Sequence, residues 1–337
     1  MVEYPLRLHN QALVVDTHCD TLKCLLPQFT RPRDSMWQDR SNVGFGTRSK
    51  LGHIDLPRLK EGGVDCQVFA ISSERDPTPA YPLRTAMEMI EAFYTEYEKY
   101  PKLVQPVTNH AEIIQANEEG KIAAMLSIEG ADVLEGRLSM LRVYHRLGVR
   151  MVGLVHSLRN LLADGVSDSR TKGGLSQFGV EVVEELNMLG MIVDVSHLSD
   201  AGFWDVMEAS KDPVVASHSN SRAVCPHPRN MTDDMIRALA EHGGVMGMNF
   251  ATDFVHETNP SVETLVDHID HIVDLVGPEH VGLGSDFDGI PSTPRGLEDA
   301  SKMPALTEEL VKREYSEDYI HLILGGNHLR LVKQVVG

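Results

Sequence analysis

The first apolar run of the chain reads Ala12-Leu13-Val14-Val15-Asp16-Thr17-His18-Cys19-Asp20, and this run decides between two fold classes. Its β-branched start predicts a buried strand, at whose end His18 and Asp20 share one side because they are two residues apart. A doubly wound open sheet would require a glycine-rich phosphate turn after its first strand. Residues 16–20 contain no glycine, so the run favours a closed α/β barrel over the open sheet.

Outward from this run, further apolar runs alternate with longer stretches of helical periodicity, which is typical of βα units around a parallel sheet. Together with residues 12–20, the predicted strands cover residues 64–71, 122–129, 151–156, 191–197, 214–218, 244–250 and 281–286. The predicted helices cover residues 82–100, 138–147, 177–189, 199–209, 232–242, 261–276, 308–314, 316–324 and 327–336. Eight such units predict a (β/α)8 TIM barrel, formed by residues 1–337 as a single catalytic domain.

Residues 27–55 are the longest stretch without periodicity, and they follow the first predicted strand. Long loops at that end of a barrel strand usually belong to the active-site face, so we expect such a loop there.

Two helix ends are marked by their chemistry. Thr232 is a capping hydroxyl before a predicted helix, and Gly190 supplies a left-handed stop after another.

The charge balance argues against one class of function. Against 31 Lys and Arg the chain has 49 Asp and Glu, which gives a formal net charge of −18 without a basic cluster. Polyanions require a basic face, so neither nucleic acid nor a membrane surface is an expected partner. The four cysteines are scattered and form no CxxC pair, which indicates a reducing compartment. No signal-peptide pattern and no apolar run of about 18 to 20 residues is present, so we expect a cytoplasmic protein.

Ionisable side chains stand at the ends of six of the eight predicted strands. They are His18 and Asp20 after the first strand, then Glu129, His156, His197, His218 and Asp286. A lone histidine at a strand end is more often structural than a ligand. In a barrel, however, all of these ends meet at one mouth, where burying so many carboxylates and imidazoles is costly unless a cation compensates them.

A set of histidines and carboxylates without cysteine favours Zn²⁺ or a similar divalent ion such as Co²⁺ or Mn²⁺. The set holds more ligands than one tetrahedral zinc needs, so two ions fit better. Glu129 can bridge them, with one ion on His18 and Asp20 and the other on His197 and His218. Two ions about 3.5–4 Å apart can hold a hydroxide between them and polarise a carbonyl, so the pattern indicates metal-assisted hydrolysis.

Short motifs in a fixed order give the chain a family resemblance from residue 13 to about residue 332. The chain resembles the renal (membrane) dipeptidase family, the M19 metallopeptidases of the amidohydrolase superfamily, whose fold is a barrel of the metal-dependent hydrolase type. The motifs are VDTHCDT (15–21), GHIDLPRLKEGGV (52–64), SIEG (127–130), DVSH (194–197), SHSNS (217–221), PRN (228–230), GLGSDFDG (282–289) and GGN (325–327).

The resemblance implies a role for each matching residue. His18 and Asp20 match the ligands of a first zinc, and His197 and His218 match those of a second. Glu129 matches the glutamate that bridges the two ions together with a hydroxide. The remaining matches are to residues that act on the substrate. His156 would polarise the scissile carbonyl, Arg229 would bind the C-terminal carboxylate, and Asp286 would shuttle a proton from the bridging water to the leaving amine.

The activity implied is that of a binuclear zinc dipeptidase acting on small dipeptides, with L-Xaa-D-Xaa dipeptides as a hypothesis. The mammalian members are secreted and lipid-anchored. Because this sequence shows neither a leader nor an apolar C-terminal tail, it resembles a bacterial cytoplasmic member, and the family makes a homodimer plausible. The loop at 157–165 departs from the family at Arg159, Leu161 and Leu162, where the preference for substrate side chains could differ.

Two alternatives remain at this point. The same metals could serve another amidohydrolase activity on a β-lactam, a lactone or an N-acyl amino acid. A substrate without a carboxylate would not need Arg229, which separates a neutral lactone from a dipeptide. The second alternative is a metal-bound, non-catalytic binding subunit. The presence of His156 and Asp286 beside a complete set of ligands argues against it.

Overall fold

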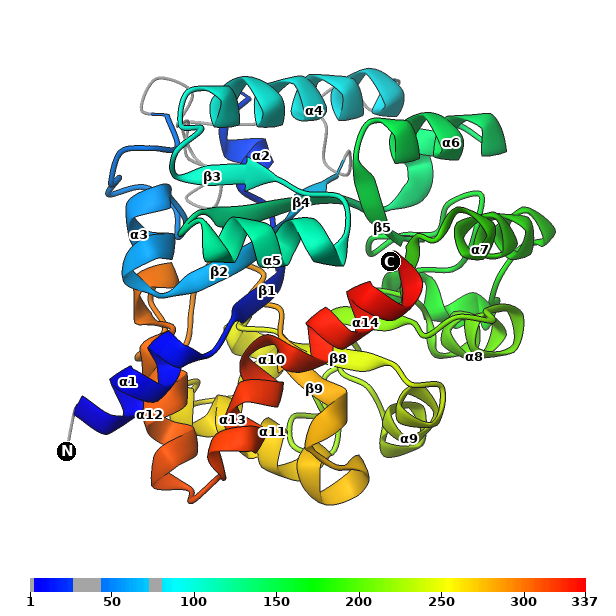
Figure 1. The fold of residues 1–337 in the computed structure, drawn as a ribbon. Coiled ribbons are helices and arrows are strands. Elements are labelled where there is room, and N and C mark those ends of the chain that lie inside the picture. The colour runs from blue at the N-terminus through cyan, green and yellow to red at the C-terminus, as the bar shows by residue number, and fades with distance from the viewer. Residues whose placement is uncertain (1–2, 27–43, 73–80) are drawn as a thin grey trace.

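A closed barrel of parallel strands forms the centre of the molecule (Figure 1). The computed structural model describes residues 3–26, 44–72 and 81–337. The ring runs in the order β2-β1-β9-β8-β7-β6-β5-β4 and is closed by pairing of β2 with β4. The strands are β1 (Val14–Cys19), β2 (Val64–Ile71), β3 (Val104–Pro106), β4 (Ile122–Glu129), β5 (Val149–Gly153), β6 (Ile192–Asp194), β7 (Val215–Ser219), β8 (Val245–Met248) and β9 (Val281–Leu283). The predicted (β/α)8 TIM barrel is therefore confirmed.

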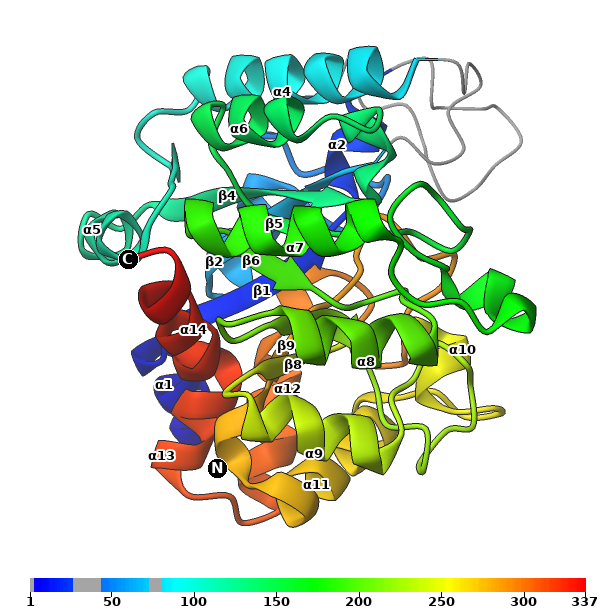
Figure 2. The same cartoon turned by 90° about the vertical axis from the view of Figure 1, so that its right-hand side faces the viewer.

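Helices surround the barrel, and in Figure 2 the helices α6, α7, α8 and α9 lie side by side along one flank, each in contact with the next. The helices are α1 (Glu3–Gln11), α2 (Thr21–Cys24), α3 (Leu56–Glu61), α4 (Pro82–Glu98), α5 (His110–Glu118), α6 (Leu138–Arg146), α7 (Gln177–Leu189), α8 (Asp200–Ala209), α9 (Asp233–Glu241), α10 (Thr252–Val255), α11 (Val262–Val276), α12 (Pro304–Lys312), α13 (Glu317–His321) and α14 (Asn327–Val335). The predicted caps are present: Thr232 accepts a hydrogen bond from the backbone N–H of Met235, and Gly190 has a φ of 64°.

Several elements were not predicted. Strand β3 has three residues, too few to show alternation, and it pairs with the first half of β4 outside the ring. Helices α1, α3 and α5 were also missed, and α5 buries only Ile113 and Ala116, so it shows almost no apolar periodicity. In the long loop expected at 27–55, residues 27–43 lie outside the described residues. The described remainder leads into α3, where the Asp55 side chain caps the helix by accepting from the backbone N–H of Arg58.

Four predicted strands run two or three residues past the carboxyl ends of the strands in the structure. The predictions 151–156, 191–197, 244–250 and 281–286 extend past observed ends at Gly153, Asp194, Met248 and Leu283. His197 and Asp286 have φ angles of 69° and 63°, in the left-handed region that no strand residue adopts. His156, His197 and Asp286 therefore stand on the loops just beyond the strands. Backbone of this kind is strained and is typical of functional sites.

The barrel interior is apolar at its amino end and polar at its carboxyl end. Helix α14, red in Figure 1, crosses the amino end and packs Leu331 and Val332 into the barrel. Side chains from seven strands meet them there, among them Val15, Cys66, Val68, Met125, Met151, Ile192, Val215 and Val245. The amino end of the barrel is thus closed by apolar side chains. A small molecule can enter the barrel from the carboxyl end. Within the described ranges, no helix combines the length and the apolar character needed to cross a membrane.

The fold contains a buried histidine whose protonation should destabilise it. The His268 Nδ1 accepts from the Ser221 backbone N–H at 3.1 Å, and its Nε2 donates to the Val255 carbonyl at 2.9 Å, which leaves no acceptor for a second proton. Burial lowers the pKa of His268 to about 4. The unfolded chain, with an ordinary pKa near 6.5, therefore binds the extra proton first as the pH falls.

We expect the unfolding free energy of the metal-free protein to fall between pH 6.5 and pH 4, with His268 contributing up to about 3 kcal/mol. In His268→Gln this contribution should be missing, so the variant should lose less stability over the same range. Urea unfolding at several pH values in the presence of a chelator measures both slopes. Equal slopes for the two proteins would contradict this assignment.

Candidate metal centre

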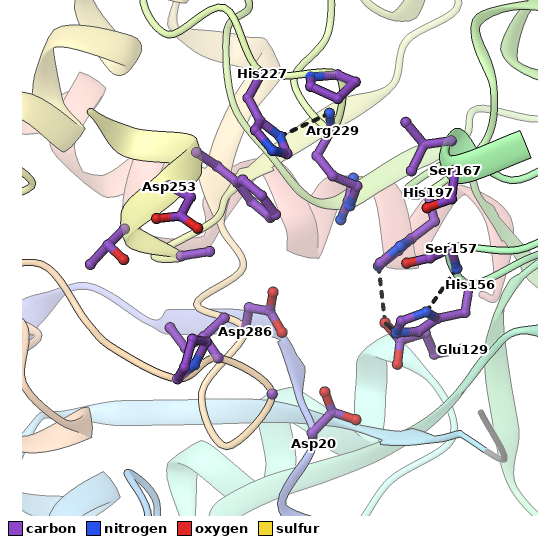
Figure 3. A pocket seen from close by; sticks show the side chains of 18 of the residues that line it. Asp20, Glu129, His156, Ser157, Ser167, His197, His227, Arg229, Asp253 and Asp286 are labelled. Atoms are coloured by element: carbon purple, nitrogen blue, oxygen red, sulfur yellow. Dashed lines mark hydrogen bonds and ion pairs between the residues drawn. The ribbon is translucent and has the colours of Figure 1, made fainter. Parts of the chain in front are cut away.

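Seven predicted site residues meet at the carboxyl end of the barrel. Figure 3 labels Asp20, Glu129, His156, His197 and Asp286 among them. Their ligand-type atoms form three overlapping groups, in each of which all atoms lie within 4.8 Å of one another. The groups are His18, Glu129 and His218; Glu129, His156 and His197; and His18, Asp20 and Asp286. The structure therefore brings together every residue predicted as a metal ligand, together with His156 and Asp286.

The Glu129 carboxylate lies at the middle of the cluster. Its Oε1 is 3.1 Å from Nε2 of His197 and 3.6 Å from Nε2 of His18, His156 and His218. The two Nε2 atoms of His197 and His218 are 2.8 Å apart. These distances place one carboxylate among four imidazoles, and the bridging role of Glu129 stays a prediction.

A second set of carboxylates surrounds His18. Its Nε2 lies 3.9 Å from Asp20 Oδ2 and 3.9 Å from Asp286 Oδ1. Asp286 is held by Asn249, whose side-chain N–H donates to Asp286 Oδ2 at 2.9 Å. This half of the site is acidic, whereas the half around His197 and His218 is formed by imidazoles.

Each side chain comes from a different part of the barrel. His18 lies on β1, Glu129 is the last residue of β4 and His218 lies on β7. Asp20 directly follows β1 as the residue before α2. The other three are carried by the loops after β5, β6 and β9, and the convergence at the carboxyl end follows from closure of a parallel barrel.

Burial sets the protonation of the imidazoles. It lowers the pKa of His156, His197 and His218 well below the ordinary value, so these rings are neutral. Burial also lowers the pKa of His18, but the negative charges of Glu129, Asp20 and Asp286 raise that pKa by more.

Among the protein groups alone, the pKa of His18 is therefore raised to about 9. Burial also raises the pKa of Asp286 to about 7; the charge of His18 opposes this rise, and the Asp20 and Glu129 carboxylates add to it.

Lys23 is a member of the site that sequence reasoning missed. Its ammonium is 2.6 Å from Asp20 Oδ1 and 3.8 Å from Glu129 Oε2, and its side chain is 3% exposed. The available signal was its spacing of three residues from Asp20 at the start of a helix. Asn249 was also missed, because an asparagine after a strand carries no distinctive pattern.

The residues fit a bound divalent cation. The His18 Nε2 is buried among carboxylates, yet within the described part of the chain it has no hydrogen-bond partner. At Gly289 the backbone passes so close that an added Cβ would overlap the carboxylates of Asp20 and Asp286. Nitrogen and carboxylate donors without thiolate suit Zn²⁺ and related ions.

A cavity of about 560 Å³ opens beside the cluster and is lined by Arg229, Phe254 and Ile290 among others (Figure 3). The Arg229 side chain is buried and donates from Nη2 to the His218 carbonyl at 3.1 Å, with its guanidinium 5.5 Å from the centre of the Phe254 ring. Its Nε has no partner within the described ranges. A buried guanidinium with free N–H groups can bind a carboxylate that enters this cavity.

Comparisons with known proteins agree with this geometry. Residues 3–336 match the membrane dipeptidase family, peptidase family M19. A dipeptidase of Clonostachys rogersoniana, verJ, is 35% identical over 98% of this chain and 86% of its own length. The dipeptidase AC, an M19 metallopeptidase of known structure, is 30% identical with a TM-score of 0.86, covering 97% of this chain and 99% of that one. A metallopeptidase of Rhodobacter sphaeroides, solved with a phosphinate mimic of the dipeptide L-Ala-D-Ala, is 28% identical with a TM-score of 0.85, covering 96% and 99%.

The position of Lys23 leads to a prediction about metal affinity. In Lys23→Met a positive charge next to Asp20 and Glu129 is removed, so we expect divalent ions to bind about tenfold more tightly or better. The metal-free variant should also melt at a lower temperature, because three buried carboxylates lose a counter-charge. Titration calorimetry with Zn²⁺ and melting curves with and without metal measure both effects.

A Lys312→Met variant is the matched control, since the exposed Lys312 ammonium also pairs with a buried carboxylate, that of Glu309 on α12. It should leave metal affinity unchanged. Unchanged or weaker zinc binding in Lys23→Met would show that this ammonium does not compete with the metal.

Proposed function

This chain belongs to the membrane dipeptidase family, peptidase family M19, and from this membership we propose that it is a binuclear zinc dipeptidase. Family membership makes the chain a peptidase hydrolase. The observation that carries the finer proposal is the position of a buried, partly unpaired Arg229 on the wall of the cavity that also holds the His and carboxylate cluster. A carboxylate anchor beside a metal centre suits a substrate as short as a dipeptide.

Two zinc ions are proposed, because the cluster divides into an acidic half and an imidazole half. His18 and Asp20 would hold one ion, His197 and His218 would hold the other, and Glu129 would lie between them. When bound, such ions polarise a carbonyl and lower the pKa of water toward neutrality. The remaining steps belong to side chains of this chain.

Arg229 would orient the substrate by binding its C-terminal carboxylate. Its side chain is anchored by the bond from Nη2 to the His218 carbonyl, which directs the rest of the guanidinium toward the cavity. The Phe254 ring beneath it limits the positions the guanidinium can adopt. The carboxylate end of a dipeptide would thus be held at a set distance from the cluster, which places the peptide bond for attack.

His156 would donate a hydrogen bond to the carbonyl oxygen of the scissile bond. Its Nδ1 accepts from the backbone N–H of Ser157 at 2.7 Å, so the neutral ring carries its proton on Nε2. Burial lowers the pKa of this ring, which keeps it neutral. A fixed N–H that faces the cavity can stabilise the negative charge that develops on the carbonyl oxygen.

Asp286 would carry the proton from the attacking water to the leaving amine. The carboxylate lines the cavity, and Asn249 fixes one of its oxygens, leaving the other toward His18. In the metal-free site burial raises the pKa of Asp286 to about 7. A carboxylate at this position can accept a proton from a water and release it to an amine.

Dipeptides of the L-Xaa-D-Xaa class are the proposed substrates. The support is the related R. sphaeroides metallopeptidase, which was solved with a mimic of L-Ala-D-Ala.

All four cysteines are buried free thiols, which supports a reducing compartment such as the cytoplasm.

Zinc-loaded protein should hydrolyse L-Ala-D-Ala and contain close to two zinc ions per chain by elemental analysis. Asp286→Asn should keep the metal and lose at least about 100-fold in kcat, because the proton carrier is gone. Asp234→Asn, on the exposed start of α9, is the control and should behave as the wild type. L-Ala-L-Ala and N-acetyl-D-Ala are assayed beside L-Ala-D-Ala to compare the other dipeptide stereochemistry and an N-acyl amino acid. Turnover of the N-acyl amino acid alone would reject the dipeptidase assignment and favour an acylase.

Arg229→Met should raise KM for L-Ala-D-Ala by about 10–100-fold, because a charge-assisted bond to the carboxylate is lost. The same variant should treat the C-terminal amide, L-Ala-D-Ala-NH₂, much as the wild type does, since an amide cannot form that bond. Steady-state kinetics on both substrates separate the two effects. An equal rise of KM on both substrates would argue against recognition of the carboxylate.

A further inference from the structure

We propose that Asp194 and Ser217 are positioning residues that hold the His218 imidazole in one tautomer, with the Nε2 lone pair turned to the metal centre. The inference rests on the proposed function in one respect, which is that His218 is a zinc ligand. The evidence for the positioning role itself is a chain of hydrogen bonds on the side of the His218 ring that faces away from the cavity.

The Asp194 carboxylate ends β6 and is buried against β7. Its Oδ1 accepts from the backbone N–H groups of Ser196 and Ser217, both at 2.9 Å. Its Oδ2 accepts from the Ser217 hydroxyl at 2.5 Å. Three bonds thus fix the carboxylate and hold the hydroxyl beside it.

The protons available to Ser217 and His218 fix the tautomer of His218. Ser217 has one hydroxyl proton, and a carboxylate can only accept, so that proton lies toward Asp194. The Ser217 oxygen is 2.8 Å from His218 Nδ1 and is left with lone pairs, so it accepts from an Nδ1–H. With its proton on Nδ1 in this bond, the neutral His218 ring has its lone pair on Nε2.

That unprotonated Nε2 faces the cluster. It lies 2.8 Å from the His197 Nε2 and 3.6 Å from Glu129 Oε1, where the second zinc is proposed. A carboxylate behind the ring also increases the basicity of the ligand, and losing such a partner typically weakens metal binding by about 10–100-fold. Asp194 and Ser217 therefore act on the metal through His218 without touching it.

The neighbouring His156 is held in the opposite tautomer, since its Nδ1 accepts from Ser157. By distance alone His156 is as close to Glu129 as His218 is, at 3.6 Å for both. The local hydrogen bonds distinguish the two rings: His218 presents a lone pair and His156 presents an N–H. One ring is thus prepared as a ligand and the other as a donor.

A second aspartate–serine pair in the barrel supplies the matched control. The Ser285 hydroxyl donates to Asp16 Oδ2 at 2.6 Å, and its backbone N–H donates to Asp16 Oδ1 at 2.8 Å. This pair joins β1 to the loop after β9 by the same kind of bonds. Its hydroxyl approaches a backbone carbonyl, that of His18 at 3.3 Å. Ser285→Ala should therefore resemble Ser217→Ala in stability without affecting the His218 tautomer.

The test is NMR of metal-free protein labelled with ¹⁵N in the histidine rings, with the His218 signals identified by their loss in His218→Gln. Wild type should show His218 protonated on Nδ1. Ser217→Ala should show a changed tautomer ratio and bind zinc about 10–100-fold more weakly by calorimetry. Ser217→Thr keeps the hydroxyl and should restore both, while Ser285→Ala should leave the His218 tautomer at the wild-type value.

Melting curves show which variants are folded, and Ser217→Thr keeps the test decisive if Ser217→Ala does not fold. A wild-type His218 protonated on Nε2, or a folded Ser217→Ala with an unchanged tautomer and zinc affinity, would overturn the proposal. The expected tautomer and affinity shifts in a protein that hydrolyses no dipeptide would uphold the positioning role and reject the proposed function.

Discussion

Three carboxylates, those of Asp20, Glu129 and Asp286, are buried together at the carboxyl end of the barrel. Like charges in a medium of low dielectric constant repel strongly, so positive charge must lie among them. Lys23 supplies one such charge within the chain, at 2.6 Å from Asp20. The neutral rings of His197 and His218 supply lone pairs for a divalent ion. His18, whose pKa among the protein groups alone is raised to about 9, supplies a further positive charge until a metal ion replaces its proton. The need to compensate buried negative charge thus accounts for both the lysine and the metal-type donors.

The rest of the barrel supports this cluster by closing the opposite end and by fixing the ligands from behind. Helix α14 and the apolar interior exclude water from the amino end. At the carboxyl end, the Asp16–Ser285 and Asp194–Ser217 pairs join neighbouring segments by bonds between carboxylate and hydroxyl. The backbone at His197 and Asp286 is strained, and the surrounding hydrogen bonds offset the free-energy cost of that strain. The proposed substrate recognition by Arg229 and the proposed hydrogen bonding by His156 would then operate on a rigid frame.

Much of the site could be foreseen because functional side chains at barrel strand ends carry a strong sequence signal. His18, Glu129 and His218 follow or end apolar runs, and those runs are strands. Other parts gave no such signal. His156, His197 and Asp286 were expected on strands but stand on loops. For His197 and Asp286 the reason is a left-handed φ, which cannot be read from an apolar run. Lys23 reads as a surface lysine in a short helix, and its burial depends on Asp20 and Glu129, the latter more than one hundred residues away. Helix α5 has too few buried residues to show a period.

The sequence by itself determined the fold class, the family and the identity of the side chains in the cluster. These depend on local alternation, on the order of the runs and on residue types, all of which are properties of the chain read in one dimension. Only the tertiary structure decided that Lys23 pairs with Asp20 and that Asn249 holds Asp286. It also decided which ring nitrogen of His156 and His218 carries a proton. Those facts depend on distances between segments far apart in the chain and on the direction of single hydrogen bonds, which exist only after the barrel has closed.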